Sequence, residues 1–463
     1  MTLARTKIFW AFLLGVGLLR LVTLGTYPLL DTTEARYGEI ARIMVDTGNW
    51  LVPQIDYGMP FWGKPPLSFW ASALSIELFH NSEFFLRLPH LLAAIGVLLL
   101  VWRLALAQGF TRTQANASMA IVATNIGFLI TAGSVMTDMM LCLSMTLAMA
   151  GFWRGWHGEL RYVYVMYAGL GIGLLAKGPL IVVLVGLALF PWLVATCGIK
   201  SMWIEVYRRL KPISGLLLML LIALPWYMLM ERASPGFLRY FIVGEHFQRF
   251  LDSGWQGDLY GSGHAKPRGT IWLYWALFAL PWSAVLLLAA FRARGEFLGL
   301  FHKPLTLFLL LWMCSPLLLF TLAGNILPAY IVPGLPAVGL LVMQAFGDET
   351  SGRGRYLLLV GPVLLLILCI YLGLFAGEEY SDKGLLAAGV DSQDDLFYFH
   401  ERPYSAQYYS GGKARITDSF PTGTRFYLVI EKDRRLGEIG KYCELRSSNE
   451  RRNLYFCRRE PPA

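Results

Sequence analysis

Charged residues are scarce in this sequence of 463 residues. Asp, Glu, Lys and Arg make up 15% of it and hydrophobic residues 56%, whereas soluble domains carry about 25% charged residues. A cleavable secretion signal is also missing, because the first apolar run, 8–30, is too long and has no small-residue cleavage site. Repeats of solenoid period and low-complexity linkers are absent. These features exclude an ordinary soluble protein and predict a polytopic membrane protein anchored by its first segment.

Cysteine is rare too, with six residues in the chain. Four lie within apolar runs, and the other two, Cys443 and Cys457, lie in the C-terminal tail. In an oxidising compartment these two could pair across adjacent strands. Two free thiols packed as small hydrophobes are the equal alternative. The histidines show no HxxxH or HExxH spacing, so no metal site is predicted from their pattern.

Apolar runs long enough to cross a membrane occur eleven times, since a spanning helix needs about 20 apolar residues. The predicted spans are 8–30, 86–107, 115–133, 137–153, 162–176, 179–197, 213–230, 271–291, 304–322, 327–346 and 356–376. The apolar segment 66–80 is short and is predicted to lie in the interface as a helix rather than to cross.

Basic residues fix the orientation of these spans. With the N-terminus inside and 66–80 interfacial, the inner loops hold Arg112, Arg154, Arg161, Lys200, Arg208, Arg209, Lys211, Arg292, Arg294, Lys303, Arg353 and Arg355. This pattern follows the positive-inside rule and accounts for the net charge of +9 without nucleic acid. Loops 31–66 and 231–270 then share the outer face with the tail, 377–463, which we predict to be a small α/β domain beside a transmembrane domain, 1–376.

Acidic and basic side chains crowd the start of the first outer loop, in "LLDTTEARYGEIARIM". Asp31 or Glu34 could act as a general base there, as carboxylates do toward an attacking hydroxyl. A solvated amphipathic helix at the membrane surface is the alternative. Lys64, between aromatics and two prolines in "PFWGKPPLSFW", could hold a lipid phosphate or simply snorkel.

Two further groups of polar residues are predicted on the same face. Asp138 and Lys177 each interrupt apolar sequence, and intramembrane ionisable residues are functional candidates by default. Loop 231–270 supplies cations suited to a phosphate or pyrophosphate. Those that we predict to bind such an anion are His246, Arg249, His264, Lys266 and Arg268.

Several motifs resemble the bacterial polyprenyl-phosphate-sugar transferases, the family of the lipid A aminoarabinose transferase, which is related to protein O-mannosyltransferases. They are "TTEARYGEIARIM", "TGNWLVPQI", "GMPFWGKPPLSFW", "SVMTDMML", "GLLAKGPL", "GEHFQRF", "HAKPRGTIWLYW" and "NILPAYIVPGLPAVGLL", in the family's order over about residues 20–345. The resemblance implies a class C glycosyltransferase fold, about 11 transmembrane helices with interfacial helices, and an active site facing the periplasm from the bacterial inner membrane. It also implies an undecaprenyl-phosphate-linked sugar donor.

The resemblance places roles on particular residues. Catalysis is implied for Glu34, with Asp31 and Asp138 as the other acids. Donor binding is implied for Arg36, Tyr37, Lys64, Lys177, His246 and Tyr330.

Two departures from the family pattern matter. Thr33 replaces the usual Asp before Glu34, which leaves either Glu34 or Asp31 as the base. Gly63 replaces a Glu that, with the histidine, holds a metal in some members. No cofactor is therefore certain, and a divalent metal is doubtful.

The function that these features predict is inverting transfer of a sugar from undecaprenyl phosphate to a periplasmic acceptor such as lipid A, another envelope glycan or a protein. A lipid or solute transporter using the same outer cavity is the alternative, and a non-catalytic lipid-binding accessory protein is a third. A transporter predicts broken or polar helices at mid-bilayer in both halves, whereas the charges here gather at one face. The sugar and the acceptor are not specified by the sequence.

Overall fold

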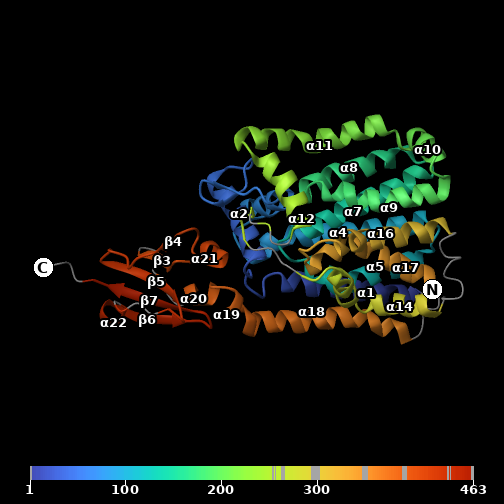
Figure 1. The fold of residues 1–463 in the computed structure, drawn as a ribbon. Helices are drawn as coiled ribbons and strands as arrows, with labels where there is room; N and C mark the ends of the chain where they lie inside the picture. The colour runs from blue at the N-terminus through green and yellow to red at the C-terminus, as the bar shows by residue number, and fades with distance from the viewer. Residues whose placement is uncertain are drawn as a thin grey trace.

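Helices lying side by side form most of the molecule, and a small sheet domain stands at one end of them (Figure 1). The structure is a computed structural model that describes residues 3–252, 255, 257–261, 266–292, 303–346, 353–387, 390, 394–434, 437 and 439–459. Within these residues, six helical segments are long and apolar enough to cross a membrane. They are α4 (Glu83–Ala107), α9 (Leu180–Cys197), α11 (Pro212–Ala233), α16 (Pro304–Thr321), η2 with α17 (Pro328–Gly334 and Leu335–Phe346), and α18 (Val360–Tyr371) with the turns η4 (Arg353–Leu359) and η5 (Leu372–Ala376).

The other five predicted spans also coincide with helices, but these are more polar, shorter or interrupted. They are α1 (Leu3–Thr23), α5 (Arg112–Ala123) with α6 (Ile126–Thr131), α7 (Thr137–Trp156), α8 (Leu160–Lys177), and α13 (Thr270–Phe278) with α14 (Trp282–Arg292). The last pair bends by 108°. Pro281 explains the break, because proline lacks an N–H and disfavours helix at the preceding residue. That these five segments cross the membrane stays a prediction.

Two span boundaries differ from the prediction. The first span was expected to run over 8–30, but α1 ends at Thr23 and an irregular segment leads to the next helix. The span predicted over 115–133 is divided, because the Asn125 side chain accepts a hydrogen bond from the Phe128 amide and so begins α6 as a new helix. Hydrophobicity alone does not reveal such caps.

Outer loop one, residues 31–66, is folded rather than extended. It contains α2 (Thr33–Thr47) and the short hairpin of β1 (Gln54–Asp56) and β2 (Met59–Pro60), and leads into α3 (Leu67–Leu78). At 1.5 Å per residue, α3 is roughly 18 Å long, well short of the hydrocarbon thickness of about 30 Å. Its length fits the predicted interfacial helix.

The long loop and the inner connections lie at opposite ends of the bundle. Loop 231–270 forms η1 (Arg239–Gln248) and α12 (Arg249–Leu251), close to α2 (Figure 1). At the far end, α10 (Ser201–Leu210) carries the basic residues predicted to face inward. The two ends of the bundle therefore differ as the charge pattern predicts.

The C-terminal part folds around one mixed sheet, as the predicted α/β class requires. The strand order is β4-β3-β5-β7-β6, with β3 parallel to β4 and β5, and β7 antiparallel to β5 and β6. Leu396 pairs with Ala414 and Tyr427 in adjacent strands, and Leu428 pairs with Tyr455. The elements are α19 (Gly377–Tyr380), α20 (Lys383–Ala387), β3 (Asp395–Phe399), α21 (Tyr404–Tyr409), β4 (Ala414–Thr417), β5 (Arg425–Glu431), α22 (Ile439–Tyr442), β6 (Cys443–Ser448) and β7 (Arg452–Arg458).

The tail cysteines form a disulfide. Cys443 and Cys457 are directly opposite each other in β6 and β7, and their Cα atoms are 4.0 Å apart. Of the two alternatives open from the sequence, cross-strand pairing is the one found. The run "PYSAQYY" forms the helix α21, which begins after Pro403.

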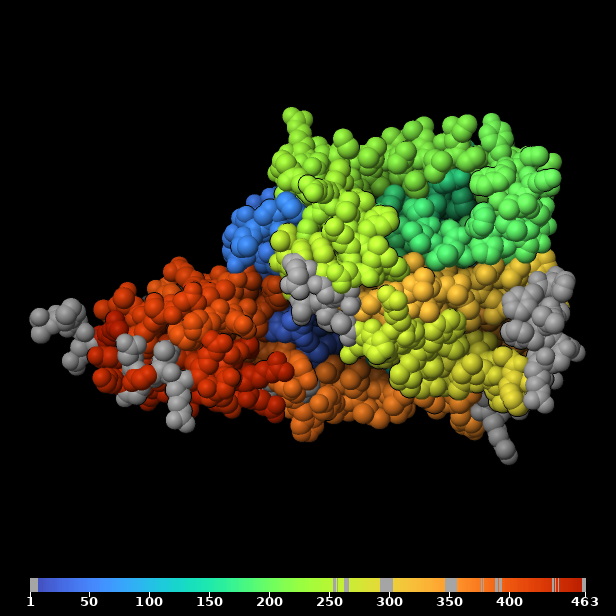
Figure 2. All heavy atoms as spheres, in the orientation of Figure 1, coloured from blue at the N-terminus to red at the C-terminus, as the bar shows by residue number. Residues whose placement is uncertain are grey.

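The C-terminal domain is fastened to outer loop one by polar contacts. Arg402 and the Gln407 amide both donate to the Asp56 carboxylate, at 2.5 and 2.9 Å. Next to this contact, between α3 and α4, Asn81 Oδ1 accepts a hydrogen bond from the Tyr408 hydroxyl at 2.6 Å. Figure 2 shows outer loop one, in blue, between the domain in red and the long loop in yellow-green. The three parts thus converge at one end of the bundle.

We expect a periplasmic reporter fused after Ala376 to be active, and a cytoplasmic reporter at the same position to be silent. Eleven spans from an inner N-terminus end outside, and Ala376 closes η5 at the end of the bundle that holds outer loop one (Figure 1). The matched fusion follows Lys200, before α10, and should show the reverse activities. A cytoplasmic signal after Ala376 would mean that α3 crosses the membrane or that another span is miscounted.

Candidate active site

Six chain segments come together at the end of the bundle that holds outer loop one, and five of them supply charged side chains. Arg36 and Tyr37 come from α2, and Lys64 precedes α3 at a Pro-Pro corner that fixes its backbone. The first turn of α7 supplies Asp138 and the last turn of α8 supplies Lys177. The long loop adds Glu245, Arg249 and Asp258, and η2 adds Tyr330. We call these nine residues the outer charge cluster.

Asp138 and Lys177 form a buried ion pair within the cluster. Lys177 Nζ lies 2.6 Å from Asp138 Oδ1, and both side chains are less than a tenth exposed. The same ammonium lies 4.5 Å from the ring centroid of Tyr330, within cation–π distance. Gly178, with φ of 79°, turns the chain sharply after the lysine, so that α8 ends at the cluster. The two intramembrane candidates predicted from the sequence are therefore partners.

A second, chain-like set of ion pairs runs through the long loop. Lys64 Nζ is 3.5 Å from Glu245 Oε1, and Arg249 is 3.0 Å from Glu245 Oε2 and 3.4 Å from Asp258. Burial lowers the pKa of Lys64. Burial alone would raise the pKa of Glu245, but the charges of Lys64 and Arg249 hold it below its ordinary value.

Arg36 lies among aromatic rings, and one of its N–H donors, the buried Nε, has no hydrogen-bond partner among the described residues. Its Nη1 donates to the Tyr260 carbonyl oxygen at 2.8 Å, and its guanidinium carbon is 5.5 Å from the ring centroid of Tyr37 and 5.6 Å from that of Tyr404. A guanidinium in this state is suited to an oxyanion.

The two sets of ion pairs face the same tyrosine. Tyr37 is within electrostatic reach of Arg36, Lys177, Asp138 and Glu245, and burial raises the pKa of its hydroxyl. The cluster contains four cationic side chains and three carboxylates, so its net charge is positive. Such a site suits an anion whose negative charge grows during reaction.

His246 is held by the backbone. Its Nδ1 lies 2.7 Å from the Phe241 carbonyl oxygen and its Nε2 lies 3.4 Å from that of Lys177. Both ring nitrogens therefore face backbone carbonyl oxygens rather than an open coordination position. Gly63 contributes no ligand, and no group of three or more His, Cys, Asp or Glu that could hold a metal occurs within the described ranges. These residues do not fit a metal ion.

Glu34, the acid that the sequence favours as base, is not directed to the outer charge cluster. Its Oε1 and Oε2 accept hydrogen bonds from Arg87 Nε and Nη2, each at 2.8 Å, and Oε1 also accepts from the Val135 amide at 3.2 Å. Arg87 is itself fully buried. The pair is bidentate, and with the Val135 amide it occupies three of the about four lone-pair positions of the carboxylate.

Asp31, the alternative base, is engaged by the C-terminal domain. Its Oδ1 accepts from the Ser405 amide at 3.0 Å, and its Oδ2 accepts from the Ser405 hydroxyl. Burial raises the pKa of this carboxyl to about 6. Of the three acids proposed from the sequence, Asp138 alone belongs to the outer charge cluster.

Two other cations predicted in loop 231–270 are more exposed than Arg249. Lys266 and Arg268 are exposed, although the Lys266 amide donates to the Gly324 carbonyl oxygen at 3.0 Å. His264 lies outside the described residues. Sequence reasoning missed Asp258, which carries no local signal. It also missed Arg87, an arginine in an apolar run that the rule for intramembrane charges would have flagged.

Comparisons with known proteins agree with this architecture. The family described as dolichyl-phosphate-mannose-protein mannosyltransferase matches residues 8–241. A curated relative from Enterobacter sp. (strain 638), named undecaprenyl phosphate-alpha-4-amino-4-deoxy-L-arabinose arabinosyl transferase, is 31% identical over 344 residues, covering 72% of this chain and 58% of the relative. A relative of the same name from Erwinia tasmaniensis is 30% identical, with 75% and 61% covered. The chain therefore spans about three-fifths of the length of these relatives.

Solved structures match the fold. The crystal structure of ArnT from Cupriavidus metallidurans bound to undecaprenyl phosphate gives a TM-score of 0.76 at 18% identity, and covers 98% of both chains. An oligosaccharyltransferase from Archaeoglobus fulgidus gives 0.53 at 12% identity, covering 90% of this chain and 65% of the other. The class C glycosyltransferase fold expected from the sequence is thus confirmed. By the family match over half its length, the chain belongs to the dolichyl-phosphate-mannose-protein mannosyltransferase family.

Proposed function

We propose that this protein is a membrane glycosyltransferase that moves a sugar from an undecaprenyl-phosphate donor to an acceptor on the periplasmic side of the inner membrane. Lipid A, which the relatives' aminoarabinose transferase family modifies, is the first acceptor to test, before another envelope glycan or a protein. The observation that carries the proposal is the outer charge cluster, with its excess positive charge at the end of the bundle that holds outer loop one.

The cluster suits the charge changes of this reaction. An acceptor hydroxyl attacks the anomeric carbon, its C–O bond forms as the bond from that carbon to the phosphate oxygen breaks, and the configuration inverts in the single displacement. The hydroxyl proton passes to a carboxylate, for which we propose Asp138. The lipid phosphate leaves with one more negative charge than it had in the donor. Lys64, Arg36 and Arg249 are preorganised to stabilise that charge.

The transporter alternative is tested by product formation without a membrane. A purified enzyme in detergent should convert lipid-linked sugar and acceptor into glycosylated acceptor, because the reaction needs no second compartment. A transporter or an accessory protein would leave both substrates unchanged under the same conditions. Mass spectrometry of the acceptor, lipid A first, distinguishes these results.

Replacing Lys64 by alanine should slow transfer by about 10- to 100-fold, the amount expected for losing a hydrogen bond to a charged phosphate. Glu245 and Arg249 keep each other paired, so expression should stay near that of the unmodified protein. The measurement is the rate of transfer from purified lipid-linked sugar. The matched control is Lys200→Ala, which removes an exposed lysine at the inner end. Transfer by the Lys64 variant at the control's rate would make Lys64 only an interfacial anchor.

A further inference from the structure

Arg20 is a buried cation that the proposed reaction does not use. It lies in the last turn of α1 with 2% of its surface exposed. Its guanidinium donates to the Thr23 hydroxyl at 3.0 Å, the Tyr27 hydroxyl at 3.4 Å and the Ile130 carbonyl oxygen at 3.1 Å. Arginine has five N–H donors, and the buried Nε finds no partner in the part of the chain that the structure describes. Donor capacity therefore remains unused.

The charge of Arg20 is also uncompensated. Among the described residues, no carboxylate lies within ion-pair distance of it, and the nearby acid Glu34 is already committed to Arg87. Arg20, Glu34 and Arg87 together leave one positive charge inside the protein. The carbonyl ends of α1 and α6 offset this charge in part, but an unpaired buried charge is costly and calls for a counterion.

A cavity of about 110 Å³ adjoins this guanidinium. Since one water occupies about 30 Å³ of liquid, the space holds a few waters or one group of phosphate size. Its polar side is formed by Arg20, Glu34 and Ser134, and its apolar side by Leu365, Leu368 and Leu372. None of the outer charge cluster residues lines it, so the cavity is separate from the proposed donor site.

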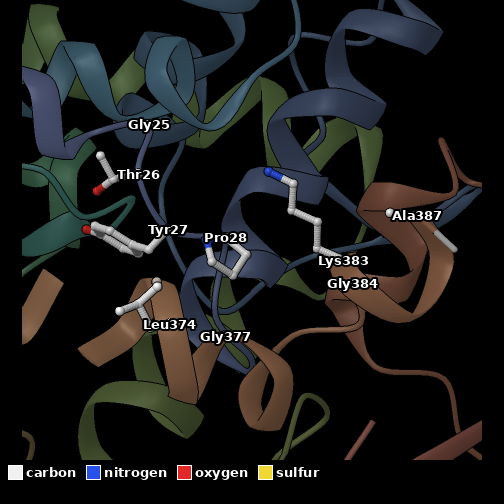
Figure 3. Close-up of a pocket in the computed structure, with 10 residues that line it drawn as sticks. Gly25, Thr26, Tyr27, Pro28, Leu374, Gly377, Lys383, Gly384 and Ala387 are labelled. Atoms are coloured by element: carbon white, nitrogen blue, oxygen red, sulfur yellow. The ribbon is translucent and has the colours of Figure 1, made fainter. Parts of the chain in front are cut away.

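The apolar wall belongs to a helix at the rim of the bundle. Figure 1 shows α18 along one edge, and its residues Leu366 and Ile367 are exposed, at 43% and 56%. An acyl chain can pack along such a surface. A second cavity of about 340 Å³, which Tyr27 also lines, is lined by Lys383 (Figure 3). The ammonium of Lys383 is paired with Glu83. Because Arg20 has no carboxylate partner among the described residues and Lys383 does, the smaller cavity is the better candidate for an anion site.

We propose that the cavity beside Arg20 binds a phosphate oxyanion, and that the phosphate belongs to a membrane lipid whose chains lie along α18. A phosphodiester supplies one negative charge and several acceptor oxygens, which match the single excess charge and the free Nε. Free phosphate shares this chemistry, but the cavity lies against α18, whose exposed residues Leu366 and Ile367 offer acyl chains an apolar surface beside it.

Native mass spectrometry of the purified protein, titrated with phosphatidylglycerol, tests this proposal. Arg20→Met should weaken binding of the lipid about 10- to 100-fold, because a charge-assisted hydrogen-bonded contact is lost. The control is Arg112→Met, which removes an exposed arginine from the start of α5. Leu368→Trp keeps Arg20 and fills the cavity, so it should weaken binding equally even if the Arg20 variant folds poorly.

Two further ligands distinguish the source of the phosphate. Diacylglycerol, which lacks the phosphate, should not bind, and inorganic phosphate should not displace the bound lipid at equal concentration. Inorganic phosphate that binds as tightly as the lipid would overturn the assignment to a lipid. Unchanged lipid binding by Arg20→Met and Leu368→Trp would overturn the site itself and leave the cavity to water. No sugar donor is present in these titrations, so the result is independent of the proposed transferase activity.

Discussion

Asp138→Asn should lower the rate of glycosyl transfer by about 10²–10⁴-fold, the range expected when a general base is removed. The acceptor hydroxyl needs a carboxylate near the departing phosphate, and Asp138 is the acid that the structure places beside Lys177 and Tyr330 in the outer charge cluster. Asparagine keeps the shape but cannot accept the proton. The assay is single-turnover transfer from purified lipid-linked sugar, normalised to folded protein, with donor binding measured separately.

A purely structural role for the ion pair is distinguished by a second variant. Asp138→Asn alone leaves the Lys177 ammonium buried without its partner, which destabilises the fold. Adding Lys177→Gln removes that charge and should restore stability while transfer stays slow. Recovery of both stability and transfer in the double variant would show that Asp138 serves only to pair with Lys177. Asp46→Asn is the control, since this acid of outer loop one is exposed and the variant should transfer normally.

Hydrophobicity and charge predicted much of the architecture because a membrane constrains both. Each of the eleven apolar runs contains helix, and the cations of α10 lie at the end of the bundle opposite the C-terminal domain. Interruptions were not predicted, because they arise from local backbone chemistry. Pro281 breaks one run and the Asn125 cap divides another, and a single such residue does not show from the sequence that the helix ends there.

The site was predicted only in part, because sequence does not show which charges meet in space. Asp138 and Lys177 were chosen separately, as rare ions in apolar sequence, and their pairing appears only in the fold. The roles of Asp31 and Glu34 were less accessible, because their partners lie far along the chain. Ser405 is 374 residues from Asp31, and Arg87 is 53 residues from Glu34. Partners so far along the chain, which hold these candidate bases in place, cannot be identified from the sequence.

Glu34→Gln should destabilise the protein by about 3–5 kcal/mol, as expected when one member of a buried ion pair is removed. Arg87 is fully buried, and it also donates to the carbonyl oxygens of Leu24, Tyr27 and Pro28, at 2.6, 2.8 and 2.9 Å. It therefore joins α4 and α2 to the segment that follows α1. Glutamine would leave its positive charge without a counterion, and the thermal unfolding midpoint in detergent should fall.

The control for this variant is the same substitution in an exposed pair. Glu159 pairs with Arg154 at 2.7 Å, but its side chain is 39% exposed, and surface pairs contribute only about 0–1 kcal/mol. Glu159→Gln should therefore leave the unfolding midpoint nearly unchanged. The difference between the two midpoints measures what burial adds to the Glu34–Arg87 pair.

The rate of transfer per folded molecule distinguishes two roles for Glu34: a structural partner of Arg87, or the general base that its position in the family motif implies. If Glu34 is only a structural partner, Asp138 remains available as the base. Glu34→Gln should then transfer sugar within a few-fold of the unmodified rate, after normalisation to the amount of folded protein. Wild-type stability combined with a 10²–10⁴-fold loss of turnover would instead identify Glu34 as the base. That result would require its carboxylate to leave Arg87 when substrates bind. The charges that follow the first span would then serve the reaction directly, rather than holding outer loop one against the bundle.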